Sequence, residues 1–297
     1  MILRPLQPRD PDSHKGNFGR ALLVGGSRGM SGAIALAALA TLRSGAGLVT
    51  IATADSCLDT VAGFEPCYMT KALADDHHGR IAYAAKSQIL ELAEAADCIA
   101  LGPGIGQSED LVRLVVELYQ ELEKPLVVDA DALNCLAKHG FVNLKPGGPR
   151  VLTPHPGEFR RLAGNEGLQP AAMPEVAKKL AAQSRAVILL KGHRTQVTDG
   201  AQTYINETGN PGMATGGSGD VLTGIITALI CQSFSPFEAA CSGTYLHGVA
   251  GDIAAENRGQ ISLIARDIID SLPDAFFFYV TSITPRRLNH QQTEQKN

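Results

Sequence analysis

Short apolar runs alternate with longer segments of helical periodicity along almost the whole chain. Apolar runs rich in Val, Ile and Leu are typical of strands that are buried on both faces of a parallel sheet. They predict strands at residues 21–26, 48–53, 97–104, 125–131, 150–157 and 186–192, and a hairpin of strands at 195–200 and 202–206. The helical segments lie at 31–45, 84–96, 111–123, 131–140, 174–184, 220–230, 236–256 and 262–272.

This order of elements predicts an α/β fold. Repeated strand–helix units with fully apolar strands favour a doubly wound, mainly parallel sheet flanked by helices on both faces. No internal repeat or linker divides the chain, so we expect a single domain over residues 1–280. The polar segment 281–297 is expected to be a disordered tail.

Glycine is the unusual feature of the composition, because 31 of the 297 residues are glycine and none is tryptophan. A glycine excess without collagen periodicity indicates backbone loops that approach a ligand closely. The formal net charge is −4 and no basic stripe is present, which argues against nucleic-acid binding. Because the chain shows no signal peptide, no membrane-length apolar stretch and no CxxC pair among its 6 cysteines, we expect a cytoplasmic protein without a membrane segment.

The richest candidate site is the sequence GNPGMATGGSGDVLTGII at residues 209–226. Glycines before an apolar helix allow phosphate oxygens to reach the backbone N–H groups at the helix N-terminus. Asp220 would then lie where a phosphate and a substrate hydroxyl meet, and could act as a general base. The alternative role for Asp220 is a simple helix cap, but capping does not require so many glycines.

Two further strand ends carry candidate residues. Lys191 and Gly192 leave an apolar strand in VILLKGHRT, where a lysine can pair with a phosphate or lie in a solvated hairpin turn. His155 lies between two prolines in LTPHPGEF, which favours a ligand contact by a rigid loop over a structural histidine. Glu158 opens the next helix and is explained by the preference for acids at helix N-termini.

Acidic and glycine-rich strand ends complete the candidates. Asp129 and Asp131 in VVDADALN could order Mg²⁺-bound water or a ligand hydroxyl, but Asp131 could equally cap the next helix. LGPGIGQ at residues 101–107 is a glycine-rich turn that is weak evidence for phosphate binding on its own.

Other nucleotide and hydrolase motifs fit poorly. GGSRG at residues 25–29 matches the Gly-x-Ser-x-Gly elbow of hydrolases, with Ser27 as nucleophile and His247 as a candidate base. No HGGG-like oxyanion segment precedes it, and the other glycine loops would remain unexplained. The Rossmann fingerprint and the P-loop are both absent, so a nucleotide site would be of another kind.

Six segments in one order resemble a known family. KGNFGRALLVGGSRGMSGAIALAALATLRSGAGLVTIAT, LGPGIG, VDADALN, LTPHPGEF, LKGHRT and GNPGMATGGSGDVLTGII closely resemble the ADP/ATP-dependent NAD(P)H-hydrate dehydratases of the ribokinase-like superfamily. The resemblance extends over about residues 15–273. An N-terminal epimerase domain, frequent in this family, is missing, so the resemblance implies a stand-alone dehydratase that works with a separate NAD(P)H-hydrate epimerase.

The resemblance implies a repair reaction. Hydrated NADH or NADPH would be returned to NADH or NADPH by phosphorylation of the ring hydroxyl and elimination of phosphate, with ADP converted to AMP and phosphate. The choice between ADP and ATP, and between the two hydrates, stays open. A vitamin- or sugar-type kinase of the same superfamily and a non-catalytic nucleotide sensor are the alternatives.

The resemblance also implies site residues and assembly. Asp220 would activate the hydroxyl, and Mg²⁺ is expected without named ligands. The residues implied to contact the hydrated dinucleotide are Ala33, Gly104, Gly106, His155 and Asp220. Those implied to bind the nucleotide are Lys191, Gly192, His193, Arg194, Thr195, Gly216, Gly217 and Gly219. A homotetramer is expected.

Overall fold

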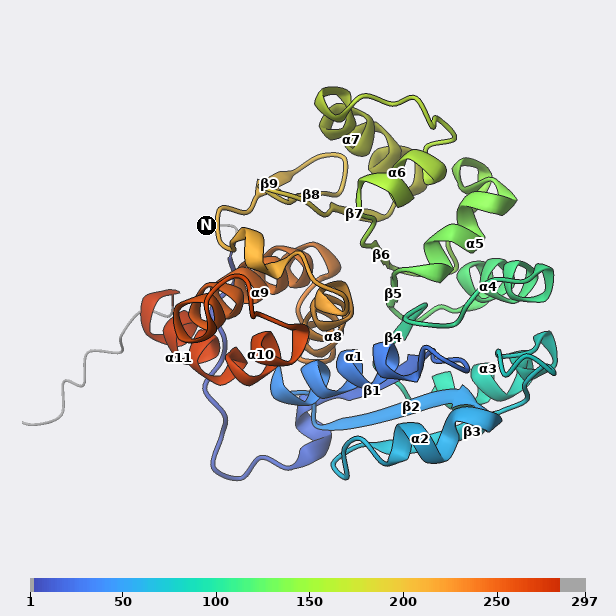
Figure 1. Ribbon diagram of the computed structural model, residues 1–297, viewed down its shortest axis with the longest axis horizontal. Coiled ribbons are helices and arrows are strands. Elements are labelled where there is room, and N and C mark those ends of the chain that lie inside the picture. Colours follow the sequence, from blue (N-terminus) through green and yellow to red (C-terminus); the bar gives the residue numbers. More distant parts are fainter. Residues whose placement is uncertain (1–2, 284–297) are drawn as a thin grey trace, which may run out of the picture.

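The computed structural model describes residues 3–283, which form one twisted sheet with helices on both faces (Figure 1). The strand order is β3-β2-β1-β4-β5-β6-β7-β8-β9. All pairs from β3 to β7 are parallel, whereas β8 and β9 join as an antiparallel hairpin, so the predicted mainly parallel sheet is confirmed. The strands are β1 (Arg20–Val24), β2 (Leu48–Ala54), β3 (Met69–Leu73), β4 (Cys98–Leu101), β5 (Leu126–Val128), β6 (Arg150–Leu152), β7 (Val187–Leu190), β8 (Gln196–Thr198) and β9 (Thr203–Ile205).

The helices cover the two faces of the sheet as the alternating pattern requires. One face carries α1 (Ser31–Arg43), α8 (Ser218–Cys231), α9 (Pro236–Arg258), α10 (Ala265–Asp270) and α11 (Leu272–Ile283) (Figure 1). The other carries α3 (Lys86–Glu94), α4 (Glu109–Glu121), α5 (Asp131–His139), α6 (Pro156–Leu162) and α7 (Met173–Ser184). The short helix α2 (Leu58–Ala62) packs beside β3. Single 3₁₀ turns occur at Lys15–Phe18, Asp55–Cys57, Tyr83–Ala85, Phe141–Asn143, Pro170–Ala172 and Pro211–Met213.

Some element boundaries differ from the sequence prediction. The edge strand β3 and the helix α2 were not predicted, because β3 is largely exposed and lacks a long apolar run. The last predicted helix is two helices, α10 and α11, and α11 continues to residue 283. The tail was expected to begin at residue 281, but residues 281–283 belong to α11. The rest of the expected tail, residues 284–297, lies outside the described residues.

Small residues allow α8 to pack closely against α1. Ala37, Ala38 and Ala40 of α1 are fully buried, and an added Cβ at Gly224 would lie 2.1 Å from the carbonyl oxygen of Ala37. These alanines of α1 are thus explained by helix packing, and this packing fixes the position of α8 above the sheet.

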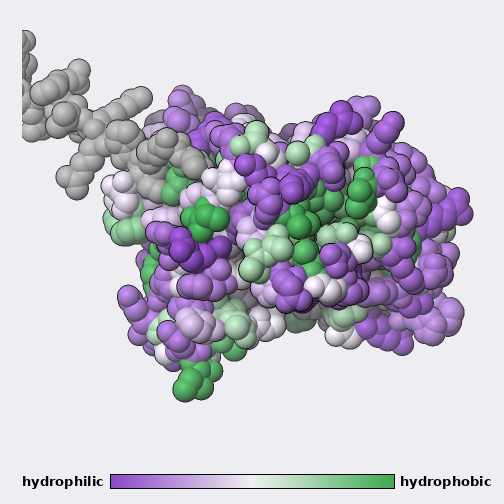
Figure 2. Space-filling model, turned by 90° about the horizontal axis from the view of Figure 1, so that it is seen from above, coloured by the Kyte–Doolittle hydropathy of each residue, from purple (hydrophilic) through white to green (hydrophobic). Residues whose placement is uncertain are grey.

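The surface carries mostly hydrophilic residues on the face that the space-filling view shows (Figure 2). Among residues 3–283, no helix combines the length and the apolar character that crossing a bilayer requires. Larger hydrophobic side chains are exposed singly or in small groups, such as Phe277 and Phe278 on α11.

Candidate active site

Residues from three parallel strands meet at the carboxyl edge of the sheet. Asp129 directly follows β5, Lys191 directly follows β7, and His155 lies shortly beyond β6. The first turn of α8, which contains Asp220, reaches the same edge, since an added Cβ at Gly219 would lie 3.2 Å from Lys191 Nζ and 3.9 Å from Asp129 Oδ2. The structure therefore brings together residues that are up to 91 positions apart in the chain (220 minus 129).

A buried carboxylate holds the lysine in place. Asp129 is 1% exposed, and its Oδ1 accepts hydrogen bonds from Lys191 Nζ at 2.9 Å and from Thr153 Oγ1 at 2.7 Å. Its Oδ2 accepts a hydrogen bond from Thr223 Oγ1 at 2.8 Å. Burial opposes the lysine charge, but the carboxylates of Asp129 and Glu158 outweigh it and raise the pKa of Lys191 above its usual range. Lys191 is therefore a charged ammonium beside the glycine loop.

The two aspartates suggested as magnesium ligands are engaged by the protein itself. Asp131 Oδ2 accepts from the backbone N–H of Gly106 at 2.9 Å, and its Oδ1 accepts from Gln107 Nε2 at 3.5 Å. Both oxygens of Asp129 are also occupied, by three protein donors. Within residues 3–283 no group of three or more His, Cys, Asp or Glu side chains is placed to hold a metal ion. Asp129 and Asp131 thus orient Lys191 and the Gly106 loop, and a role for either carboxylate in ordering Mg²⁺-bound water stays a prediction.

The glycine loop leads into a long helix with free N–H groups at its start. Gly217 caps α8 with φ +90°, and an added Cβ there would lie 2.6 Å from Leu36 Cδ1. Gly216 is exposed, with no atom within 4 Å of where its Cβ would lie. The N–H groups of a first helical turn have no helical acceptor and favour anions. Together with the Lys191 ammonium, this arrangement suits a phosphate group.

Asp220 is a carboxylate whose proton affinity is raised by its surroundings. Burial raises the pKa of Asp220 to about 8, with a further increase from the negative charge of Asp129 and an opposing effect of Lys191. The helix cap of α8 is Gly217, and no side chain caps this N-terminus. The capping alternative for Asp220 is therefore not supported, and a pKa near neutrality suits a general base.

His155 caps α6 and has a fixed ring orientation. Its Nδ1 accepts from the backbone N–H groups of Gly157 at 3.0 Å and Glu158 at 3.4 Å, while Glu158 Oε2 accepts from the backbone N–H of His155 at 2.8 Å. Burial and then the Lys191 charge lower the pKa of His155, whose side chain is still 51% exposed. Burial also raises the pKa of Glu158 to about 7. A neutral, oriented imidazole therefore faces outward beside Lys191.

The loop after Lys191 is a compact, exposed turn. Thr195 Oγ1 donates to the carbonyl oxygen of Gly192 at 2.9 Å and accepts from the Gly192 N–H at 3.2 Å. His193 and Arg194 are exposed, and Arg194 pairs with Glu207 at 3.3 Å. The turn is thus preformed beside the ammonium, and nucleotide binding by its residues stays a prediction.

Ala33, Gly104 and Gly106 lie around the crevice between β1 and β4. The strand order reverses at this point of the sheet, which is where doubly wound folds bind ligands. Gly104 has φ +65°, and an added Cβ would lie 2.4 Å from the carbonyl oxygen of Met30 and 3.2 Å from Ala33 Cβ. Gly106 is linked to Asp131 through its N–H. The loop after β4 therefore needs glycine at position 104 to pack against Met30.

Ser27 does not form a hydrolase site. It is 1% exposed, and its Oγ donates to the carbonyl oxygen of Gly104 at 2.8 Å. The candidate base, His247, instead lies with its Nε2 3.3 Å from Ser218 Oγ, and burial lowers its pKa to about 4. Ser27 is thus a structural link between two loops of the crevice.

The sequence did not indicate the contacts that three residues make in the site. Thr153 and Thr223 hold Asp129, and Glu158 lies 3.9 Å from Lys191 Nζ. Thr153 directly follows β6, and Thr223 lies one helical turn after Asp220 on α8. Two sequence features could have indicated the threonines. Thr153 is a hydroxyl residue at the end of a strand, and Thr223 is a hydroxyl residue three positions after the candidate base Asp220, on the same face of the helix.

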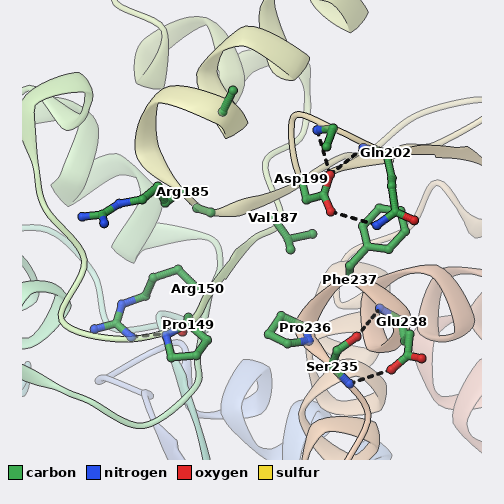
Figure 3. A pocket seen from close by; sticks show the side chains of 13 residues that line it. Pro149, Arg150, Arg185, Val187, Asp199, Gln202, Ser235, Pro236, Phe237 and Glu238 are labelled. Carbon is green, nitrogen blue, oxygen red and sulfur yellow. Dashed lines mark hydrogen bonds between the residues drawn. The ribbon is translucent and has the colours of Figure 1, made fainter.

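A cavity of about 770 Å³ opens at the opposite edge of the sheet, where β6 and β7 begin (Figure 3). The Asp199 carboxylate in this cavity accepts from the backbone and side chain of Gln202, and Glu238 accepts from the Ser235 backbone N–H. The buried guanidinium of Arg150 donates to backbone carbonyl oxygens. Asp199, Glu238 and Arg150 are thus used within the chain, and the cavity contains none of the residues that meet at the carboxyl edge.

Residues 21–274 match the model of the NAD(P)H-hydrate dehydratase family. The chain belongs to this family. Among curated relatives, the bifunctional NAD(P)H-hydrate repair enzyme Nnr of Moorella thermoacetica is 48% identical over 272 residues, which cover 90% of this chain and 51% of the relative. The chain spans about half the length of the curated relatives it matches.

Solved structures of similar proteins confirm the fold of the chain. The ADP/ATP-dependent NAD(P)H-hydrate dehydratase of Bacillus subtilis, co-crystallised with ATP and Mg²⁺, is 33% identical with a TM-score of 0.79, covering 93% of this chain and 95% of its own. A ribokinase-like superfamily protein of Enterococcus faecalis is 30% identical with a TM-score of 0.77, covering 94% and 96%. The predicted ribokinase-like fold is thereby confirmed.

Proposed function

We propose that this chain dehydrates hydrated NADH or NADPH to NADH or NADPH, with ADP as the phosphoryl donor. The observation that carries the proposal is the Asp220 carboxylate, which lies beside the Lys191 ammonium and the free N–H groups of α8. Membership of the dehydratase family and the likeness to the Bacillus subtilis enzyme support this substrate class.

The reaction has two chemical steps. Asp220 takes the proton of the ring hydroxyl, and the hydroxyl oxygen bonds to the β-phosphorus of ADP while the bond to the AMP oxygen breaks. The phosphate ester then leaves with the C–O bonding pair, and the adjacent ring carbon loses a proton as the double bond re-forms. The products are NADH or NADPH, AMP and phosphate. If ATP is the donor, attack on the γ-phosphorus releases ADP.

The nucleotide and the hydrate occupy neighbouring parts of the carboxyl edge. The N–H groups of Gly216, Gly217 and Gly219 and the Lys191 ammonium stabilise the transferring phosphoryl group. The turn from Gly192 to Thr195, with His193 and Arg194, clasps the rest of the nucleotide. The hydrated ring is contacted by Ala33, Gly104, Gly106 and His155.

Further parts of the proposal concern the cofactor, the assembly and the cell. Mg²⁺ enters with the nucleotide phosphates, since such ions are commonly held by substrate phosphates. A homotetramer, a cytoplasmic location and partnership with a separate NAD(P)H-hydrate epimerase are expected. Oligomeric state is measured by light scattering of the purified chain, and magnesium dependence by turnover after chelation and re-addition.

The competing function is a kinase for a small alcohol, which would use the same base. The two functions differ in product, so purified protein is given hydrated NADH and ADP, and separately vitamin- and sugar-type alcohols. We expect recovery of absorbance at 340 nm with stoichiometric AMP and phosphate. Accumulation of a phosphorylated alcohol, with hydrated NADH untouched, would favour the kinase.

An Asp220→Asn variant that binds ADP but has lost turnover excludes a non-catalytic sensor as the role of the wild type.

A further inference from the structure

A hollow of about 550 Å³ lies next to the site, between α5, α6 and the loop after β4. Its walls are formed mainly by polar and charged side chains, with both signs of charge represented. The lining residues are Gln107, Asn134, Ala137, Lys138, Arg161 and Glu166. Its volume falls within the range of small-molecule sites.

Two residues that we assign to the hydrated dinucleotide, Gly106 and His155, lie close to residues that line the hollow. Gln107 directly follows Gly106, and both bind the Asp131 carboxylate. On the other side, Arg161 belongs to the helix that His155 caps, and an added Cβ at Gly157 would lie 3.8 Å from Arg161 Nη1. A ligand that lies between Gly106 and His155 would therefore extend into the hollow.

The cations of the hollow differ in how they are used. Lys138 Nζ is paired with Glu109 at 2.6 Å. Arg161 is exposed and donates through Nε to Asn134 Oδ1 at 2.9 Å, and it forms no ion pair with any of residues 3–283. The amide of Asn134 thus orients a guanidinium whose Nη groups lack a carboxylate partner in that range. A planar guanidinium held in this way matches a phosphate group.

We propose that this hollow holds the adenosine half of the hydrated dinucleotide and that Arg161 contacts one of its phosphates. The inference rests on the proposed function, because a dinucleotide with its nicotinamide ring at Asp220 must place its second nucleotide elsewhere. The group that Arg161 contacts is a phosphate in either of two positions. It is the pyrophosphate, which both hydrates contain, or the 2′-phosphate, which only hydrated NADPH contains.

The alternative location for the adenosine half of the dinucleotide lies past Met30, near Arg28. Arg28 is exposed, and its side chain lies against Gly79, in the loop after β3. Arg28 and Arg161 are both exposed arginines, so they provide a matched comparison.

The experiment measures KM and kcat for hydrated NADH and hydrated NADPH at saturating ADP in wild type, Arg161→Gln and Arg28→Gln. Arg185→Gln, at the opposite edge of the sheet, controls for the loss of one exposed positive charge. We expect Arg161→Gln to raise KM for the hydrate about tenfold or more, with kcat unchanged and with the KM for ADP, measured separately at saturating hydrate, also unchanged. Asn134→Asp, which keeps the acceptor for Arg161 but adds a negative charge, should raise the same KM.

The outcomes separate the possibilities. An effect on hydrated NADPH alone assigns Arg161 to the 2′-phosphate, and an equal effect on both hydrates assigns it to the pyrophosphate. The proposal would be overturned if KM for both hydrates stayed unchanged in Arg161→Gln and Asn134→Asp. It would also be overturned if Arg28→Gln were the only variant that raised KM for a hydrate. Wild-type protein that converts neither hydrate would contradict the proposed function itself, whereas wild-type conversion with an unaffected Arg161→Gln variant contradicts only the assignment of the hollow.

Discussion

Replacement of Asp220 by Asn is expected to abolish turnover and to stabilise the folded chain. The carboxyl group has a pKa of about 8 in the folded protein against 3.8 for an ordinary aspartate, because burial and the charge of Asp129 disfavour its ionised form. Folding therefore retains a proton that the unfolded chain loses. This costs stability at neutral pH, and the uncharged amide of Asn avoids the cost.

The sign and size of the effect follow from the two pKa values. Below about pH 4 both states are protonated, so Asp and Asn should give equal stability. Between 3.8 and about 8 the wild type loses stability as the pH rises, and above about 8 the full penalty is present. At pH 7 roughly three pH units at about 1.4 kcal/mol each amount to about 4 kcal/mol. This corresponds to a rise in Tm of roughly 5–10 °C for a chain of this size.

Thermal unfolding of wild type and Asp220→Asn between pH 4 and pH 9 measures the difference. Asp59→Asn, at an exposed position of α2, is the matched control and should show no such pH-dependent gap. Turnover of hydrated NADH by Asp220→Asn should fall by about 10³-fold, since a positioned base contributes up to about 10⁴-fold. A variant that is less stable at pH 8, or a stability gap that does not change with pH, would refute the assignment of Asp220 as a desolvated carboxylate.

Three further substitutions test the remaining contacts of the site. Gly219→Ala would place a Cβ 3.2 Å from Lys191 Nζ, so steady-state kinetics should show KM for ADP raised by about tenfold. Thr223→Val removes a donor to Asp129 and should lower the free energy of unfolding by about 1–3 kcal/mol in denaturant titrations. Ser27→Ala should keep turnover within about twofold and lower stability by about 1 kcal/mol, whereas lost turnover in a folded variant would revive the hydrolase alternative.

The buried part of the fold was predictable because its pattern is strong. The strands that became β1, β4, β5 and β7 are continuous apolar runs, and their order with the helices implies a parallel sheet. The edge strand β3 has four of its five residues exposed or only partly buried, so hydrophobic periodicity could not reveal it. Its pairing with β2 is a tertiary effect.

The site was predictable in its residue types but not in their bonding. Strand-end positions indicated Asp129, His155 and Lys191, since carboxyl ends of parallel strands share one edge. The sequence could not tell whether Asp129 holds a metal or a lysine, because that depends on two threonine hydroxyls, Thr153 just after β6 and Thr223 in α8. Long-range hydrogen bonds of this kind require the folded arrangement.

The central claim is tested most directly by product analysis with purified protein, hydrated NADH, ADP and Mg²⁺. The account predicts that absorbance at 340 nm is regained with one AMP and one phosphate per NADH, and that Asp220→Asn loses this conversion while it still binds ADP. Hydrated NADH that remains unchanged with folded wild-type protein that binds ADP, or an Asp220→Asn variant as active as wild type, would contradict it.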